Sequence, residues 1–569
     1  MPSQFFGLNI AYTGLLASNA AMNTTSNNIA NVQTEGYSRQ QVTQQASNAL
    51  RVFQTYGCAG AGVETLAIER VRDEFYDGRF WDNNAQLGEY DMKQYYMQQL
   101  ETYFDDDGKS TGFKTIFDQL MVTGMQALLK DPNSATAKSQ FVGYAGALTE
   151  YFNGMAGNLE KVQKDINQEI KLKVDEINSI AGEVATLNKQ INTIELTGVK
   201  ANELRDRRTL LIDELSKIVD VQVKETPIID ANNENRETGA NRYMVKIAGG
   251  QMLVDGSDYN GLECVARTSY EKVNQTDIDG LYEVYWADGQ KFNLYNASMG
   301  GDLAGLIQMR DGNNGENFTG QVTATGTTTT ADGKTHDTVT VKVTKAYLQD
   351  LNKCNLSDQG GILDLGNQEF YYDSWEYTCE YDANGNPTYT YTFTLSDSEK
   401  NPRGITNDRV GKKAEIGTNL SYQGIPYYMN QMNEWIRTFS QKFNDILTSG
   451  YSGNGDPGVK MFTGNKATGG EQFLLDDAAK RYDKQEKKAS KMTVKVNDDS
   501  YYRLTAKNFD ILEAIEQDPG LMANRKDAAD GVEQNDLLND LKNLATDKSK
   551  MSFRGCNACL LYTSPSPRD

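Results

Sequence analysis

Residues 5–40 of the chain are FFGLNIAYTGLLASNAAMNTTSNNIANVQTEGYSRQ. Within this stretch the apolar residues Leu8, Leu15, Met22 and Ile29 follow one another at intervals of seven. Seven residues make two helical turns, so these four side chains share one face of a predicted helix from about Phe5 to Ala30. We call Leu8, Leu15, Met22 and Ile29 the seam. The residues three positions further on are small or β-branched, which favours close packing against one partner helix: Ala11, Ser18, Thr25 and Val32.

The helix that carries the seam has no charged residue. No Asp, Glu, Lys or Arg occurs before Glu35, and Asn, Ser and Thr occupy the faces beside the seam. An uncharged helix of this kind is poorly solvated when it stands alone, whereas protein surfaces on several sides can bury it. Copies of the same chain in a polymer would supply those surfaces. The sequence therefore favours a subunit that self-assembles.

The helix is predicted to end in Asn27-Asn28-Ile29-Ala30-Asn31, and Thr34-Glu35-Gly36-Tyr37 then forms a turn into an extended segment, because Asn and Gly adopt the conformations that close a helix. These residues resemble the N-terminal signature shared by the bacterial flagellar axial proteins, which are the rod, hook and hook-associated proteins. Ser38-Arg39-Gln40 is most similar to the hook-associated members of the hook–filament junction. An Asn-rich helix cap in an unrelated soluble protein is the alternative interpretation of the same residues.

The resemblance implies a structural subunit of the bacterial flagellum that forms a ring-like homo-oligomer at the distal end of the hook. It implies three partners, which are the hook protein, a second junction protein (hook-associated protein 3) and an export chaperone. It also implies an extracellular protein that leaves through type III export with an uncleaved N-terminus. The expected assembly interface consists of the seam and the turn: Leu8, Leu15, Met22, Ile29, Asn27, Asn28, Asn31, Thr34, Gly36 and Tyr37.

Length and charge limit the possible function classes. The chain has 569 residues, enough for roughly three or four domains. Its 57 basic and 78 acidic residues give a net charge of −21, and phosphate binding needs clustered basic residues, so no nucleic-acid partner is expected. No stretch reaches the ~18–20 apolar residues of a membrane-spanning helix, and the N-terminus lacks the basic start of a cleaved signal peptide. We therefore expect no membrane insertion.

The predicted fold class is multidomain α+β. Residues 1–50 are assigned to a terminal coiled-coil helix and its turn. Residues 51–311 and 421–555 are assigned to a mainly helical middle domain, a long helical rod with antiparallel strands at 221–305, because apolar residues recur at three- and four-residue steps from Leu159 to Ile194. Residues 312–420 are assigned to an inserted all-β outer domain, since Thr/Val and aromatic alternation flank its turns.

The residue patterns also predict the individual elements. Helices are expected over 73–104, 112–130, 135–194, 201–216, 427–448 and 509–544, the last with a break at 518–520. Strands are expected over 221–223, 243–247, 251–256 and 492–504. The helix at 201–216, ANELRDRRTLLIDELS, also resembles the hook-associated proteins. Its charged residues are predicted to form a solvated ion-pair network: Arg205, Asp206, Arg207, Arg208, Asp213 and Glu214.

The end of the chain departs from the family pattern. The resemblance implies a long C-terminal helix that pairs with the N-terminal one and binds the chaperone, but none is predicted after Arg554. Residues 559–569, CLLYTSPSPRD, resemble translated sequencing-adapter sequence and are expected to be a non-native tail. A natural Pro/Ser-rich tail is the alternative. With a non-native tail, the seam has no partner within this chain and the chaperone site is lost.

No catalytic, cofactor-binding or metal-binding residue is predicted. The single histidine, His336, is expected in a solvated turn, which excludes two-histidine metal centres. The acidic runs at 105–108 and 382–385 lack the twelfth-position glutamate of a calcium loop and are predicted to form turns. The six cysteines are scattered, and only Cys556 and Cys559 have motif spacing.

Two other functions stay open at this point. The first is a hook or distal-rod protein, which the long helical middle argues against because hook proteins are mainly β outside their terminal helices. The second is of another class, a surface enzyme or adhesin that acts through residues 312–420.

Overall fold

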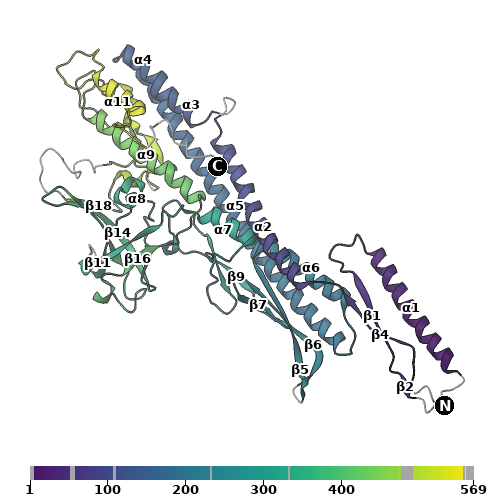
Figure 1. Cartoon of the computed structure of the whole chain (residues 1–569). Coiled ribbons are helices and arrows are strands. Elements are labelled where there is room, and N and C mark those ends of the chain that lie inside the picture. Colours follow the sequence, from purple (N-terminus) through teal and green to yellow (C-terminus); the bar gives the residue numbers. More distant parts are fainter. Residues whose placement is uncertain are drawn as a thin grey trace. The chain divides into compact units, whose positions relative to one another are not determined.

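The computed structural model describes the chain except residues 1–4, 52–57, 107–110, 231–232, 331–332, 468–469, 476–490, 555–557 and 559–569. The predicted mixture of helices and antiparallel strands is confirmed, and the longest described helix is α5 (Ala135–Glu195), with 61 residues. The described chain forms two compact units (Figure 1). The first contains Met1–Met92, Glu169–Val265 and Glu283–Leu306, and the second contains Lys93–Gln168, Ala266–Tyr282 and Ile307–Asp569.

The first unit begins with helix α1 (Phe6–Ala30), which lies beside a two-stranded antiparallel ribbon of β1 (Gln40–Ala46) and β4 (Val63–Arg70) (Figure 1). The helix begins and ends where the apolar spacing predicts. Two short strands pair within the loop between β1 and β4, namely β2 (Leu50–Arg51) and β3 (Cys58–Ala59). The ribbon leads into α2 (Glu74–Phe104), which belongs to the first unit up to Met92.

The rest of the first unit combines helices with a four-stranded antiparallel sheet. Its further elements are the second part of α5, α6 (Asn202–Ile218), β5 (Val221–Asp230), β6 (Asn233–Ile247), β7 (Gln251–Asp255), β8 (Asp258–Tyr259) and the start of α7 (Gly301–Asp311); β9 (Leu262–Ala266) and β10 (Tyr282–Trp286) form a separate pair. Asparagines on α5 bind the strand backbone: Asn178 donates to Leu262 O at 2.7 Å and Asn188 to Gly256 O at 2.7 Å. These side chains fix the sheet against the helix.

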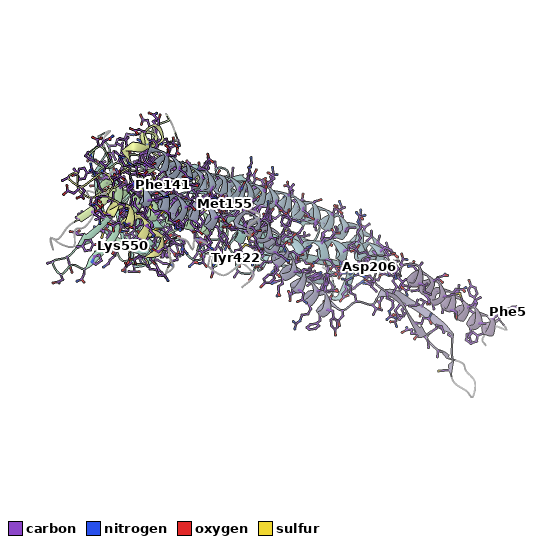
Figure 2. The ribbon with its side chains drawn as sticks, turned by 90° about the horizontal axis from the view of Figure 1, so that it is seen from above. Phe5, Phe141, Met155, Asp206, Tyr422 and Lys550 are labelled. Carbon is purple, nitrogen blue, oxygen red and sulfur yellow. The ribbon has the colours of Figure 1, made fainter. Side chains whose placement is uncertain are left out.

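The second unit has a helical core filled by aromatic rings. Its helices are α3 (Phe113–Asp118), a π-helical turn (Gln119–Gly124), α4 (Met125–Lys130), the first part of α5, α8 (Ala346–Gln349), α9 (Ile425–Thr448), α10 (Glu513–Gln517) and α11 (Asp536–Thr546). On α9, Trp435 stacks on Phe439 at 4.7 Å between ring centroids and meets Phe152 of α5 at 5.2 Å. Figure 2 labels Phe141 and Met155 along α5, and both are buried.

The second unit also contains a closed antiparallel barrel. Its strands are β11 (Phe318–Thr329), β12 (Thr335–Lys342), β13 (Gly361–Leu365), β14 (Glu369–Tyr381), β15 (Pro387–Leu395) and β16 (Lys413–Ile416). Strand β13 pairs with both β16 and β14, which closes the ring β13-β16-β11-β12-β15-β14. Buried aromatic side chains such as Trp375, Tyr391 and Phe393 fill its interior. The Thr/Val and aromatic alternation predicts β11, β12, β14 and β15, whereas β13 and β16 lie outside the alternating segments.

Two predicted segments near the C-terminus differ in the structure. Only β18 (Lys491–Lys495) of the strand expected over 492–504 is a strand, and it extends the edge of β14, because a turn at Asp498 and Ser500 redirects the chain. Of the helix expected over 509–544, residues Phe509–Ile511 form strand β19, which pairs with β17 (Phe462–Gly464). The expected helix is present in α10 and ends before a 3-10 turn at Pro519–Leu521. Residues 522–535 form turns, bends and irregular segments, and helix returns in α11.

The predicted turn at His336 is also wrong. His336 lies on β12 opposite Thr328, and its Nδ1 contacts the Leu395 carbonyl oxygen at 3.1 Å. The Asp382 turn is confirmed, since its carboxylate accepts the backbone amides of Asn384 and Asn386. Asp106 bonds Thr115 in the same way at the start of α3. Asp107, Gly108, Cys556, Cys559 and the tail at 559–569 lie outside the described residues.

Candidate assembly site on the N-terminal helix

The seam lies on the exposed face of α1. Leu8, Leu15, Met22 and Ile29 are 66%, 59%, 65% and 69% exposed. Figure 2 shows the side chains of this helix, beginning with Phe5, which is exposed as well. No described residue covers the seam. Four apolar side chains in regular register on an exposed helix face are typical of a surface that a partner buries.

The opposite face of α1 packs on the ribbon. Ala17 and Thr24 are its buried residues. Gln44 of β1 donates a 2.8 Å hydrogen bond to the Ala17 carbonyl oxygen, and the Val63 amide of β4 contacts Thr13 Oγ1 at 3.4 Å. The ribbon therefore holds one side of the helix and leaves the seam free, which the heptad spacing alone does not reveal.

The end of α1 is closed by side-chain hydrogen bonds of the predicted turn. Asn31 Nδ2 donates to both the backbone and side-chain oxygens of Asn27 at 3.0 Å, which satisfies a carbonyl that the ending helix leaves free. Thr34 Oγ1 donates to Asn31 Oδ1 at 3.1 Å, and the Tyr37 amide bonds the Thr34 carbonyl. The turn is thus a connected polar network.

Asn28 is the residue that ties α1 to β1. Its Oδ1 accepts hydrogen bonds from the Tyr37 hydroxyl and from the Gln40 amide, both at 2.9 Å. Its Nδ2 donates to the Gln40 carbonyl oxygen at 2.9 Å. The Asn28 side chain therefore binds the Gln40 backbone as a neighbouring strand would. Gln40 itself is buried. We call the Asn28 bonds to Tyr37 and Gln40 the Asn28 clasp.

The two sequence motifs meet in the structure. Gly36 has φ +75, and a Cβ atom there would lie 3.2 Å from the Leu210 Cβ of α6, so the turn requires glycine for its conformation and for the close approach. The Ser38 amide donates to Asp206 Oδ2 at 3.2 Å. Burial raises the pKa of the Tyr37 hydroxyl, and the charges of Asp206 and Glu203 raise it further.

The ion pairs of α6 are buried, so the prediction of a solvated network is wrong for all but two of its residues. Arg205 Nε bonds Glu195 Oε1 at 2.6 Å and its Nη2 bonds Glu225 Oε1 at 2.9 Å. Arg208 is only 3% exposed. Arg207, at 67% side-chain exposure beside Glu183, and Glu214 are the exposed members of the predicted network. The partners at 195 and 225 lie on α5 and β5, which the local spacing of charges on α6 cannot indicate.

Sequence reasoning missed two arginines that support the site. Arg70, at the end of β4, bonds Asp206 Oδ1 at 2.8 Å, and Arg72 bonds Asp77 at 2.7 Å and the Ser38 hydroxyl at 3.3 Å. Their only sequence signal is the pair of basic residues between an alternating strand and a helix. In the structure they connect the ribbon, the turn and α6.

Two family models match the chain in these regions. Residues 97–331 match the flagellar hook-associated protein FlgK helical domain, and residues 8–37 match the flagella basal body rod protein model. The resemblance to the flagellar hook-associated proteins is confirmed. The second match covers the seam and most of the turn, and the first includes the Ala201–Ser216 motif that meets them.

Individual hook-associated proteins show the same relationship. The chain is 35% identical over 231 residues to flagellar hook-associated protein 1 of Bacillus subtilis, covering 39% of this chain and 45% of that protein. It is 30% identical over 264 residues to the protein of the same name from Escherichia coli, covering 45% and 44%. The matched region thus spans less than half the length of these relatives.

A solved structure gives a weaker match. The flagellar hook junction protein FlgK from Burkholderia pseudomallei aligns with 79% of this chain and 66% of its own, at 13% identity and a TM-score of 0.42. Among the described residues no cluster of three or more His, Cys, Asp or Glu side chains is placed to hold a metal ion. None of the described helices is both long and apolar enough to cross a membrane.

Proposed function

We propose that this protein is a structural subunit of the bacterial flagellum that forms the hook–filament junction after type III export. The observation that carries the proposal is the exposed seam on an uncharged helix whose sequence matches a flagellar rod model. Burial of a Leu, Ile or Met side chain stabilises by roughly 1.5–3 kcal/mol. Four such residues in one register supply a specific adhesive face for assembly.

The proposed domain arrangement follows the sequence assignment. A terminal helix and turn at 1–50 form the inner contact, a mainly helical middle domain covers 51–311 and 421–555, and an inserted outer β domain covers 312–420. The barrel strands between Phe318 and Ile416 support the insertion, although β18 adds to the same sheet.

The proposed partners are further copies of the same chain, the hook protein and hook-associated protein 3. The seam offers them an apolar surface, and the turn residues set the position of that surface against α6. The seam and turn residues of the expected interface are all proposed to act in this contact, the seam directly and the turn through the Asn28 clasp. An export chaperone is proposed as a further partner.

The alternatives receive less support. Helices α5, α6 and α9 lie well inside the chain, which does not fit a hook protein with helix only at its ends. The barrel of the insertion has its interior filled by aromatic side chains, so an adhesin or enzyme would have to use its outer surface or loops. The family matches favour the hook-associated proteins over both alternatives.

Binding to isolated hooks tests the proposal. The tagged full chain is incubated with hooks from a strain that lacks its own hook-associated protein 1, and gold-labelled antibody locates it by electron microscopy. We expect gold at the distal hook end. Label along the whole hook would support the hook-protein alternative, and absence of label from the distal end would contradict the junction assignment.

A further inference from the structure

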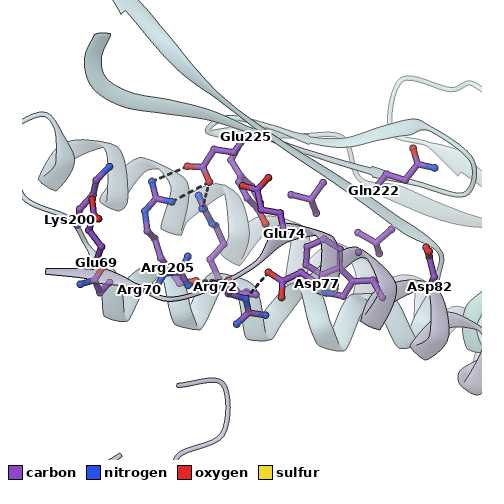
Figure 3. Close-up of a pocket in the computed structure, with 18 residues that line it drawn as sticks. Glu69, Arg70, Arg72, Glu74, Asp77, Asp82, Lys200, Arg205, Gln222 and Glu225 are labelled. Atoms are coloured by element: carbon purple, nitrogen blue, oxygen red, sulfur yellow. Dashed lines mark hydrogen bonds and ion pairs between the residues drawn. The ribbon is translucent and has the colours of Figure 1, made fainter. Parts of the chain in front are cut away.

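A polar cavity of about 520 Å³ lies in the first unit, between the end of β4, the start of α2, α6 and the strands β5 and β6 (Figure 3). Its lining residues come from all of these elements and include Arg70, Arg72, Lys200, Arg205 and Arg208. The cavity is separate from the seam, since none of the seam residues lines it. In the proposed assembly role, Arg70 and Arg72 only connect the turn to neighbouring elements, and the open space of the cavity has no function.

Arg208 is the buried cation of this cavity. Its Nη1 donates to Asn188 Oδ1 at 2.9 Å, its Nη2 bonds Glu225 at 3.0 Å, and its guanidinium lies 3.6 Å from the centre of the Tyr243 ring. Its Nε has no hydrogen-bond partner, although the residue is only 3% exposed. A buried donor without an acceptor costs roughly 1–3 kcal/mol, so a ligand that supplies the acceptor is stabilised here.

The basic and acidic residues that line the cavity balance in number, with five of each, so the case for a ligand depends on the position of the free donor. Burial lowers the pKa of Arg208, and the neighbouring cations Arg205 and Arg70 lower it further, against the opposing effects of Tyr243 and Glu225. Burial is the largest of these effects. Arg205, by contrast, bonds two carboxylates, Glu195 and Glu225, which outweigh its burial and raise its pKa.

The acidic residues of the cavity do not supply the missing acceptor. Glu225 already accepts hydrogen bonds from Arg205 and Arg208, and Asp77 accepts one from Arg72, as the dashed lines in Figure 3 show. Glu69, Glu74 and Asp82 are exposed, so they lie in solvent rather than against the buried guanidinium. Any further anion near Arg208 must come from outside the cavity.

We propose that this cavity binds a carboxylate group carried by an acidic stretch of a neighbouring polypeptide, with Arg208 Nε as the buried donor and Arg70 beside it. A carboxylate matches the planar guanidinium and forms charge-assisted hydrogen bonds with it. The volume of about 520 Å³ holds several residues rather than a single small anion. The inference does not depend on the flagellar assignment, because it uses only contacts within the first unit.

Calorimetric titration of the full chain with short peptides tests this proposal. The probes are acetylated and amidated tetraglutamate, the matched tetraglutamine, and the free anions glutarate and phosphate. We expect tetraglutamate to bind at least about 10-fold more tightly than tetraglutamine, as expected when roughly 1.4 kcal/mol of charge-assisted bonding is lost. Binding should also weaken with added salt.

Variants locate the site. Arg208→Gln is expected to weaken tetraglutamate binding at least about 10-fold. Arg207→Gln, one position away on the exposed side of α6, is the matched control and should leave binding unchanged. Because Arg208→Gln removes a buried cation and can impair folding, Arg70→Gln provides a second test at a partly exposed position.

Three outcomes would overturn the proposal. Equal binding of tetraglutamate and tetraglutamine would show that charge is not recognised. Phosphate or glutarate binding as tightly as tetraglutamate would show that a free anion, rather than a polypeptide carboxylate, is the ligand. Unchanged tetraglutamate affinity in a folded Arg70→Gln variant would place the binding elsewhere.

Discussion

Asn28 shows how one side chain determines the geometry of the assembly site. Replacing it with alanine removes its bonds to the Tyr37 hydroxyl and to both backbone groups of Gln40. Because Gln40 is buried, its unsatisfied amide and carbonyl should destabilise the junction of α1 and β1 by about 1–3 kcal/mol. We expect Asn28→Ala to accelerate hydrogen exchange at the Gln40 amide, measured by mass spectrometry.

Asn23→Ala provides the matched control for the clasp. Asn23 lies on the same helix but is exposed, so this change should leave exchange at Gln40 as it is in the unmodified chain. Equal protection of the Gln40 amide in the Asn28→Ala and Asn23→Ala variants would show that the clasp does not hold β1 to the helix.

The buried pair of Glu195 and Arg205 predicts that the free energy of unfolding of the first unit decreases at acidic pH. Burial raises the pKa of Glu195, but the hydrogen bonds and charge of Arg205 outweigh this and hold the pKa below its ordinary value of 4.5. A lowered folded-state pKa gives stability that is present above the unfolded-state value and is lost as pH falls through the folded-state value. Acidification below about pH 4.5 should therefore reduce the free energy of unfolding.

The variant Glu195→Gln isolates this effect. It should be less stable than the unmodified chain at about pH 7, by roughly 1.5–3 kcal/mol for lost hydrogen bonds to a charged group. The difference should shrink as the pH falls below about 4.5, because the carboxyl group of the unmodified chain then becomes protonated. Thermal unfolding followed by circular dichroism measures it, with Glu183→Gln in the exposed pair as control. A stability difference that does not change with pH would refute the linkage.

At the scale of the element, the two faces of α1 have separable roles. The seam is exposed, so the double change Leu15→Ser and Met22→Ser should alter the stability of the free chain by less than about 0.5 kcal/mol. The same change should abolish binding to the distal hook end.

Ala17→Leu tests the opposite face of the helix. Ala17 is buried against the ribbon, so extra side-chain volume there should lower the stability by about 1–3 kcal/mol.

Thermal melting and hook binding of the two variants give the comparison. The account expects the seam variant to melt like the unmodified chain and to fail in binding, and the Ala17→Leu variant to lose stability in the first unit. A seam variant that binds hooks normally would show that the seam is not the adhesive face.

The same helix shows how much the sequence can predict. Heptad spacing is a local signal, and it places α1 correctly, but it does not reveal that the ribbon packs on the opposite face and leaves the seam exposed. The helical pattern at 509–544 is confirmed only in α10 and α11, because residues Phe509–Ile511 pair as a strand with β17 from a distant part of the chain. The burial of Arg208 is equally hidden, since Glu225 and Asn188 lie on other elements. The cavity that Arg208 and Glu225 line depends on tertiary structure and has no signal in the spacing of residues along the sequence.

At the scale of the whole molecule, a subunit that carries one adhesive helix and a separate cavity has two independent contact surfaces. In a head-to-tail contact, one surface of a subunit meets a different surface of the next copy, and such contacts can close into a ring. Each subunit of a ring therefore needs two contact surfaces. If the junction role is correct, loss of the seam should prevent attachment even when the cavity residues are intact.

The central claim is that the seam is open in the free chain and buried on assembly. Maleimide labelling of Leu15→Cys, quantified at that residue by mass spectrometry, tests it most directly, with Asn9→Cys on an exposed face beside the seam as reference. The account predicts that both sites react at similar rates in the free chain, and that hook binding slows Leu15→Cys by at least about 10-fold relative to Asn9→Cys. A Leu15→Cys that is already protected in the free chain, or that stays fully reactive on the hook, would contradict it.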